Sequence, residues 1–130
     1  MKTISIDIET YSSVNLQKAG VYKYAESEDF DVLLFAYKED AQPTKVVDLA
    51  NGEKIPAHIV AALTDASVIK HAFNATFEWV CLNRAGYFTP IEQWRCTMIH
   101  GLYCGYPAGL EAIGKAIGLR FNRSILKCKS

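Results

Sequence analysis

The chain has 130 residues, half of them hydrophobic, and its 14 basic side chains balance its 14 acidic ones. This length suits one domain, because domains cluster at roughly 100–150 residues. The apolar content excludes a disordered chain, and no apolar run approaches the roughly 20 residues that a membrane-spanning helix needs. An acidic residue at position 7 argues against a secretory signal. We therefore expect one soluble, cytoplasmic domain that has no membrane partner.

Charge is divided unevenly along the chain. Residues 1–92 carry 8 basic and 13 acidic side chains, whereas residues 93–130 carry 6 basic and 1 acidic. A basic segment beside an acidic body suits a metal site next to the path of a polyanion. A basic tail that only aids solubility explains the same numbers equally well, so charge leaves both interpretations open.

The cysteines point away from a zinc site. Cys81, Cys96, Cys104 and Cys128 include no closely spaced pair. A structural zinc site usually takes two ligands from one tight turn, and such a pair is absent. We therefore expect reduced, mostly buried thiols.

The first half of the chain has the pattern of three strands. Residues 2–8 alternate polar and apolar side chains, which is typical of a strand with one buried face. Residues 32–37 form a continuous apolar run, as expected for a strand buried on both faces. A polar hairpin joins this run to another short strand. We predict strands at 2–8, 32–37 and 45–49, and a short helix near 14–18.

The second half alternates helices with one strand. Pro56 in the first turn and apolar residues four apart predict a helix at 56–64. A later helix begins at Asn74, which can cap it, and ends at Gly86. Between these helices we predict a strand at 67–72, and after them two helices at 97–104 and 109–117. This order of elements predicts an α/β fold with a mixed sheet.

Asp7 and Glu9 are the first candidates for chemistry. Side chains two positions apart in a strand point to the same face, with Cα atoms about 6.5–7 Å apart. Both carboxylates therefore leave the strand together, while Ile8 enters the core. Two like charges this close repel each other unless a cation lies between them or one is protonated. Mg²⁺, which prefers oxygen ligands, suits such a pair, although acidic pairs at strand ends are also common without a function.

A third acidic candidate stands near the start of a helix. Asn74 and Glu78 are four residues apart and therefore share a helical face. A carboxylate in the first turn is also stabilised by the helix dipole. An N-cap with a dipole-compensating glutamate would explain these two residues equally well, so the combination with Asp7 and Glu9 is the informative part.

That combination resembles the first two motifs of the DEDD-type 3′–5′ exonucleases. The first motif is matched by Asp7-Ile8-Glu9-Thr10, and the second by His71-Ala72-Phe73-Asn74-Ala75-Thr76-Phe77-Glu78. More narrowly, the chain is similar to the proofreading domain of phage or prophage family-A DNA polymerases over about residues 3–119. The likeness continues through residues 20–25, 35–37, 96–98 and 109–114.

This resemblance implies a fold and a reaction. The fold is the ribonuclease H-like mixed sheet, three antiparallel strands plus a parallel strand, flanked by helices and here incomplete at the C-terminus. The reaction is hydrolysis of the 3′ ends of single-stranded nucleic acid with Mg²⁺ or Mn²⁺ as cofactor, two ions in the family and one or none expected in this chain. DNA is expected before RNA, but the cleft of the family accepts either, so the choice between them stays open.

The resemblance also implies roles for single residues. Asp7, Glu9 and Glu78 take the places of metal-binding, catalytic carboxylates. Thr10 is expected beside the terminal nucleotide through its backbone, and Asn74 is expected to orient the site. Candidates for stacking on unpaired bases, each with core packing as the alternative, are Tyr11, Phe77 and Trp79.

The chain departs from the family at the third motif. Family members carry a Tyr or His followed by an Asp on a C-terminal helix, but no Asp or Glu follows Glu111 here. We therefore expect a truncated exonuclease domain at 1–119 and a basic tail at 120–130. Its activity should be lowered by several orders of magnitude, since one positioned catalytic group contributes about 10²–10⁴-fold. Glu78, where many members have Asp, is a minor departure.

Two alternatives to an active enzyme stay open. One is a non-catalytic remnant that binds nucleic acid or a partner chain through its basic C-terminal third. The other is an interaction module that self-associates through an apolar surface exposed by truncation. Convergence of the three carboxylates would favour the enzyme, whereas the acid-free C-terminal segment favours the remnant.

Overall fold

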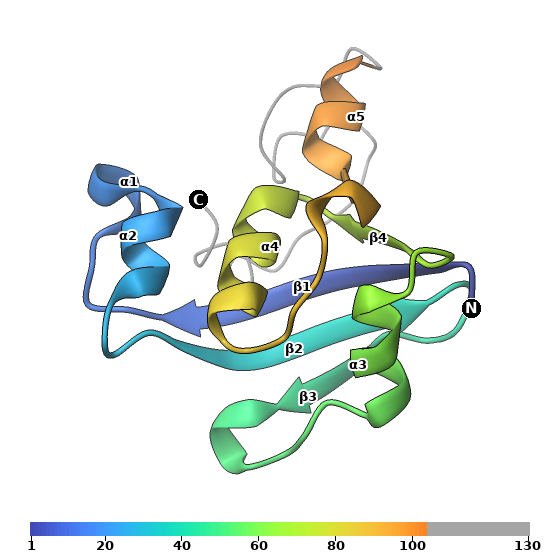
Figure 1. Ribbon diagram of the computed structural model, residues 1–130, viewed down its shortest axis with the longest axis horizontal. Helices are drawn as coiled ribbons and strands as arrows, with labels where there is room; N and C mark the ends of the chain where they lie inside the picture. The colour runs from blue at the N-terminus through green and yellow to red at the C-terminus, as the bar shows by residue number, and fades with distance from the viewer. Residues whose placement is uncertain (104–130) are drawn as a thin grey trace.

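The computed structural model describes residues 1–103, which form a five-stranded sheet with its helices (Figure 1). The strands are β1 (Thr3–Tyr11), β2 (Asp31–Glu39), β3 (Lys45–Asp48), β4 (Ile69–Ala72) and β5 (Trp94–Cys96). The α-helices are α1 (Leu16–Ala19), α2 (Val21–Glu26), α3 (Ala57–Thr64), α4 (Ala75–Arg84) and α5 (Thr97–Tyr103). Two short 3₁₀ helices are η1 (Leu49–Asn51) and η2 (Ile91–Gln93).

The sheet is mixed, and its strand order is β3-β2-β1-β4-β5. β1 pairs antiparallel with β2, and β2 pairs antiparallel with β3. On the other side of β1, β4 runs parallel to β1 and β5 runs parallel to β4. The predicted ribonuclease H-like arrangement is confirmed, with β5 as one more parallel strand.

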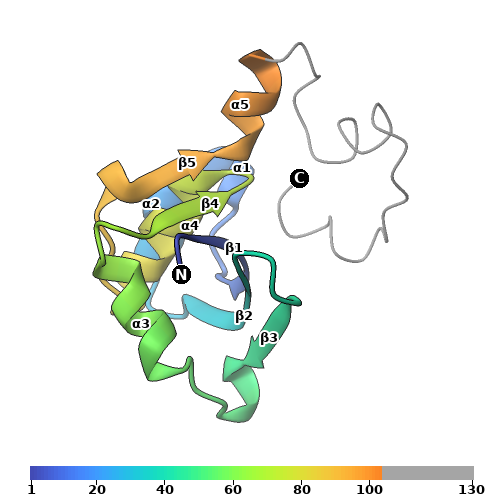
Figure 2. The same cartoon turned by 90° about the vertical axis from the view of Figure 1, so that its right-hand side faces the viewer.

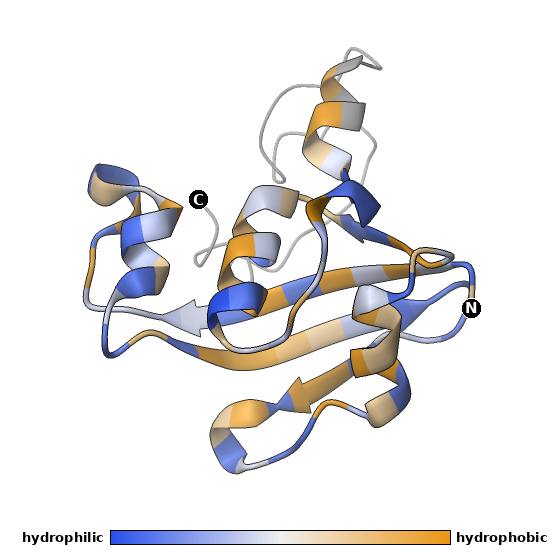
Figure 3. Cartoon of the chain, viewed as in Figure 1, coloured by the Kyte–Doolittle hydropathy of each residue, from blue (hydrophilic) through white to orange (hydrophobic). Residues whose placement is uncertain are grey.

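Helices α2, α3 and α4 lie on one face of this sheet, which Figure 2 shows from the side. The alternating apolar residues of β1 point toward that face, and Ile4, Ile6 and Ile8 are buried there. They form one core with apolar residues of α3 and α4, among them Leu63 and Leu82. Figure 3 shows the alternation along β1 as apolar bands separated by polar ones. This burial follows from the period of two that every strand has.

β1 is longer than its parallel neighbour β4, and this divides it into two halves. Residues 3–5 pair with β4, whereas the later residues of β1 have no partner in β4. Residues 7–11 therefore extend beyond the end of β4, where the following helix α4 packs against β1. A β-bulge between Glu9 and Thr10 also interrupts the pairing with β2. The C-terminal half of β1 is thus paired along one edge only.

β5, α2 and the two 3₁₀ helices were not predicted. β5 has three residues, too few for a period to be recognised, and α2 lies in a segment for which only the short helix near 14–18 was predicted. The predicted short helix corresponds to α1, and the predicted strand at 67–72 begins two residues later, at Ile69. The predicted helix at 109–117 and the basic tail at 120–130 lie outside the described residues.

The cysteines in the described part of the chain are Cys81 and Cys96. Cys81 is buried and Cys96 is half-buried. Cys104 and Cys128 lie outside the described residues. Within residues 1–103, no helix is both long and apolar enough to cross a membrane.

Candidate functional site

Asp7 and Glu9 lie on the face of β1 opposite to Ile6 and Ile8. Ile6 and Ile8 are buried in the core, and side chains alternate along a strand, so the two carboxylates share the other face. We call this side of the sheet the carboxylate face. Both side chains are half-buried, and the Oδ1 atom of Asp7 is shielded from solvent.

Glu78 comes from α4, the helix that borders the C-terminal half of β1. It lies in the first turn of α4 and is 0% exposed, in a row of buried residues that includes Phe77 and Cys81. Its Oε2 atom is buried as well. The position at the start of α4 follows from the short connection after β4, which ends beside the middle of β1. The structure therefore brings the element that carries Glu78 next to the strand that carries Asp7 and Glu9.

These carboxylates fit a divalent cation in their donor chemistry. Mg²⁺ and Mn²⁺ take oxygen ligands, and enclosing a carboxylate oxygen is costly unless charge or hydrogen bonds compensate it. Within residues 1–103, however, no three His, Cys, Asp or Glu side chains lie close enough to hold a metal ion between them. The donor type therefore fits, whereas the described part of the chain does not assemble a complete centre. The assignment of Asp7, Glu9 and Glu78 as metal ligands stays a prediction.

Thr10, the next predicted contact residue, is held by a tyrosine of α2. The hydroxyls of Thr10 and Tyr24 form a hydrogen bond of 2.8 Å. The ring of Tyr24 also contacts Phe30 edge-on, with centroids 5.9 Å apart, and Phe77 at 6.1 Å. Tyr24 therefore joins the end of β1 to the start of α4.

The aromatic candidates differ in exposure. Tyr11, at the end of β1, is 54% exposed. Phe77 is 5% exposed and packs in the core against Tyr24, so for this ring the structure shows the packing alternative. Trp79 is half-buried, and its indole Nε1 donates a hydrogen bond of 2.8 Å to the carbonyl of Thr89. Tyr11 is therefore the candidate with the most surface to offer a base.

Asn74 occupies the N-cap position of α4, but its side chain makes no capping hydrogen bond. The predicted capping role is therefore wrong. The backbone at Asn74 instead has φ −124° and ψ 78°, and its carbonyl accepts a bond of 3.0 Å from the N–H of Phe77. Since backbone geometry alone begins this helix, the role of Asn74 in orienting the site stays a separate prediction.

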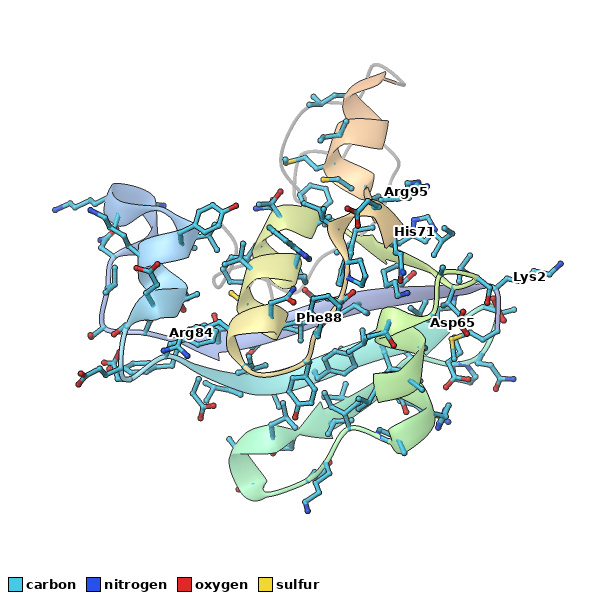
Figure 4. All side chains as sticks on the ribbon, in the orientation of Figure 1. Lys2, Asp65, His71, Arg84, Phe88 and Arg95 are labelled. Carbon is cyan, nitrogen blue, oxygen red and sulfur yellow. The ribbon has the colours of Figure 1, made fainter. Side chains whose placement is uncertain are left out.

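A pocket of about 680 Å³ lies between β4, β5 and the starts of α4 and α5. The strand register pairs His71 with Ser5 of β1 and with Arg95 of β5, so these residues lie on the same face of the sheet. Figure 4 labels His71 and Arg95. The guanidinium of Arg95 donates to the carbonyls of Glu92 and Trp94, both at 2.9 Å. The pocket is lined by His71, Ala75, Thr76, Ile91, Trp94, Arg95, Cys96, Thr97 and Ile99.

Sequence reasoning did not single out Tyr24, Arg95 or Lys70. Tyr24 lies in the matched segment 20–25, which was a usable signal. Arg95 lies in the short strand β5, which leaves no periodic signal. Lys70 sits in an otherwise apolar run, and only the structure shows that it is 0% exposed.

The buried Lys70 is satisfied by oxygen acceptors. Its Nζ donates to the carbonyls of Asp65 and Val68, each at 2.8 Å, and to Oε1 of Gln93. Burial lowers the pKa of Lys70, and the negative charge of Asp65 opposes this shift only partly. Lys70 therefore ties the loop before β4 to the loop before β5.

Comparisons with known proteins show what this chain is similar to. No protein-family model matches it. The DNA polymerase of Bacillus phage SP02 is 50% identical to it over 122 residues, which make up 92% of this chain and 18% of the polymerase. The chain therefore spans less than a fifth of that relative.

Solved structures share its fold. NrnC of Brucella melitensis matches with a TM-score of 0.67 at 18% identity, over 93% of this chain and 55% of NrnC. NrnC bound to pGG also matches, with a TM-score of 0.63 at 17% identity and the same coverage. RNase D of Escherichia coli, an exoribonuclease involved in structured RNA processing, matches with a TM-score of 0.64 at 20% identity, over 95% of this chain and 30% of RNase D. The chain is therefore related to one part of a phage DNA polymerase and shares its fold with NrnC and RNase D.

Proposed function

We propose that the chain is a metal-dependent 3′–5′ exonuclease domain that shortens single-stranded nucleic acid from its 3′ end. The observation that carries this proposal is the 50% identity to a phage DNA polymerase across nearly the whole chain. The fold shared with an exoribonuclease, and with a protein that was solved with pGG bound, supports it. Polymerase activity is not part of the proposal, because the chain spans only 18% of that relative.

In this proposal the carboxylate face binds Mg²⁺ or Mn²⁺. Asp7 and Glu9 hold the ion from β1, and Glu78 completes the ligand set from α4. A divalent ion in such a site lowers the pKa of a water and stabilises the charge that develops on the phosphate. Thr10 and Tyr11 follow directly in the strand, so they are positioned to meet the terminal nucleotide. Stacking of a base on a ring such as that of Tyr11 contributes about 1–3 kcal/mol.

We further propose that the chain by itself has a low rate. No Asp or Glu follows Glu111 in the sequence, so no residue there can act as a fourth carboxylate. A group that positions or deprotonates the attacking water contributes about 10²–10⁴-fold to a rate. A chain that lacks both groups of the third motif is therefore expected to act slowly.

DNA is the expected substrate, because the relative that covers most of the chain is a DNA polymerase. RNA is the competing substrate, since RNase D shares the fold and is an exoribonuclease. The cytoplasm stays the proposed location of the activity.

The test is degradation of a 5′-labelled single-stranded DNA, and of the matching RNA, with Mg²⁺ or Mn²⁺. We expect stepwise loss of 3′ nucleotides, faster on DNA, that falls at least about 100-fold in Asp7→Ala. The matched control is Glu28→Gln, which removes an exposed acidic charge outside the proposed site and should keep the wild-type rate.

Two results would contradict the proposal in different ways. Equal shortening by the wild type and Asp7→Ala would show that these carboxylates do not catalyse the reaction. Binding of single-stranded DNA without any shortening would instead favour the non-catalytic remnant.

We also propose that the chain self-associates. Several large apolar side chains between positions 88 and 102 are 46–67% exposed, namely Phe88, Ile91, Ile99 and Leu102. Exposed apolar side chains favour association because burying them removes apolar surface from water. Light scattering after size-exclusion chromatography tests this, and a monomer at all concentrations would contradict it.

A further inference from the structure

The C-terminal half of β1 pairs with β2 alone, and that pairing is irregular at one point. The β-bulge between Glu9 and Thr10 breaks the regular pairing with β2, and β4 pairs only with residues 3–5. Bulges bend a strand and re-aim its side chains, and they occur often beside active sites. The strand pairs alone therefore do not determine where Glu9 and Thr10 lie relative to α4.

α2 contacts this half of β1 through Tyr24. Its hydroxyl bonds to the hydroxyl of Thr10 at 2.8 Å, directly after the bulge. Its ring packs against Phe77, with centroids 6.1 Å apart, and Phe77 is the residue before Glu78. α2 and α4 are also packed against each other, and Figure 1 shows α2 at the end of β1 and beside α4. One side chain therefore touches both elements that carry the proposed metal ligands.

We propose that Tyr24 is a positioning residue that sets the carboxylates of β1 against Glu78 of α4. This inference rests on the proposed function, because it concerns the same site. The ring of Tyr24 provides the contact to α4, and its hydroxyl provides the contact to β1. A phenylalanine would keep the first contact and lose the second. The hydroxyl is therefore the part that aligns the bulged end of β1.

The role is distinct from ordinary core packing. Tyr24 is half-buried at the rim of the core, and its ring is also held edge-on by Phe30 at 5.9 Å. These ring contacts predict that Tyr24→Phe folds normally. Residues that orient metal ligands typically change metal affinity about 10- to 100-fold when they are replaced. A hydroxyl that only filled space would change the midpoint of unfolding and leave metal affinity unchanged.

The experiment measures Mn²⁺ binding by electron paramagnetic resonance, which follows the signal of the free ion and needs no turnover. The variants are Tyr24→Phe, Thr10→Val and the double variant, each with its thermal midpoint recorded. We expect each single variant to weaken Mn²⁺ binding about 10-fold. The double variant should be no weaker than either, because both remove the same hydrogen bond.

Two further variants serve as matched controls. Tyr22→Phe removes a hydroxyl from the same helix, at a side chain that is 59% exposed, and should keep the wild-type affinity. Thr10→Ser returns a hydroxyl to β1 and should recover most of the affinity that Thr10→Val loses.

Each result decides one point. Unchanged affinity in Tyr24→Phe, or additive losses in the double variant, would overturn the positioning role while leaving the proposed function intact. A wild-type chain that binds no Mn²⁺ would instead overturn the proposed metal site, and the inference with it. The two failures are distinguishable because one appears only in the variants and the other in the wild type.

Discussion

The two halves of β1 are built from the same alternating pattern but lie in different surroundings. Residues 3–5 have β2 on one side and β4 on the other. Residues 7–11 pair with β2, with a bulge, and have no partner in β4. The first half is therefore paired along both edges, whereas the second half is paired along one edge and has the hydroxyl of Thr10 bonded to Tyr24 of α2.

The first half of β1 therefore belongs to the structural scaffold, and the second half carries the candidate site. A strand with two neighbours has its backbone groups satisfied and its side chains set by register. A strand that extends beyond the end of one neighbour can present side chains at an edge, where a ligand can approach. The acidic residues Asp7 and Glu9 occur where β4 has ended, whereas the first half of the strand is dominated by core packing.

The largest expected difference in stability loss is between a core substitution in the first half of β1 and a carboxylate substitution in the second half. Ile4 is 0% exposed, so Ile4→Ala should lower the free energy of unfolding by about 2–5 kcal/mol through lost burial and a cavity. Asp7→Asn keeps the shape of the side chain and should cost less than about 1 kcal/mol. Urea denaturation measures both, and equal losses would show that Asp7 belongs to the scaffold.

A smaller loss in the free energy of unfolding is expected at the hydrogen bond between Thr89, which follows α4, and Trp94 of β5. Thr89 is 0% exposed, and its Oγ1 accepts a hydrogen bond of 2.8 Å from Nε1 of Trp94. Thr89→Val keeps the volume but leaves this buried donor without its acceptor, which should cost about 1–3 kcal/mol. The control Thr64→Val alters an exposed threonine and should change stability by less than about 0.5 kcal/mol. Similar midpoints of urea denaturation for the two variants would show that the hydrogen bond between Thr89 and Trp94 does not stabilise the fold.

The smallest expected effect is a pH dependence that comes from Lys70. Burial lowers the pKa of Lys70 in the folded chain below the ordinary lysine value of 10.5. The unfolded chain therefore binds more protons between these two values, and stability should rise as the pH increases toward 10.5. As the pH falls through the lowered pKa, this contribution is lost.

Thermal unfolding across that pH range tests the effect of Lys70. Lys70→Met should remove the rise, because the side chain no longer titrates. Lys54→Met, which alters an exposed lysine, should retain it. A rise that persists unchanged in Lys70→Met would assign it to other groups.

Sequence patterns predicted the elements with a clear period and missed those without one. The alternation in β1 and the apolar run of β2 were sufficient to predict both strands, because their buried positions extend over many residues. β5 is three residues long, and α2 buries only Ala25 fully, so neither leaves a strong pattern. The capping role of Asn74 failed for a related reason: residue type suggested a side-chain bond, but the local backbone decided against it.

The sequence by itself determined that Asp7 and Glu9 share one face of a strand, because covalent geometry alternates side chains along any strand. It also determined, through its resemblance to a known family, the order of the two acidic motifs. Only the tertiary structure decided where β4 ends, that α4 packs against β1, and that Tyr24 bonds to Thr10. Those features depend on register and packing between segments far apart in the chain, which no local period specifies.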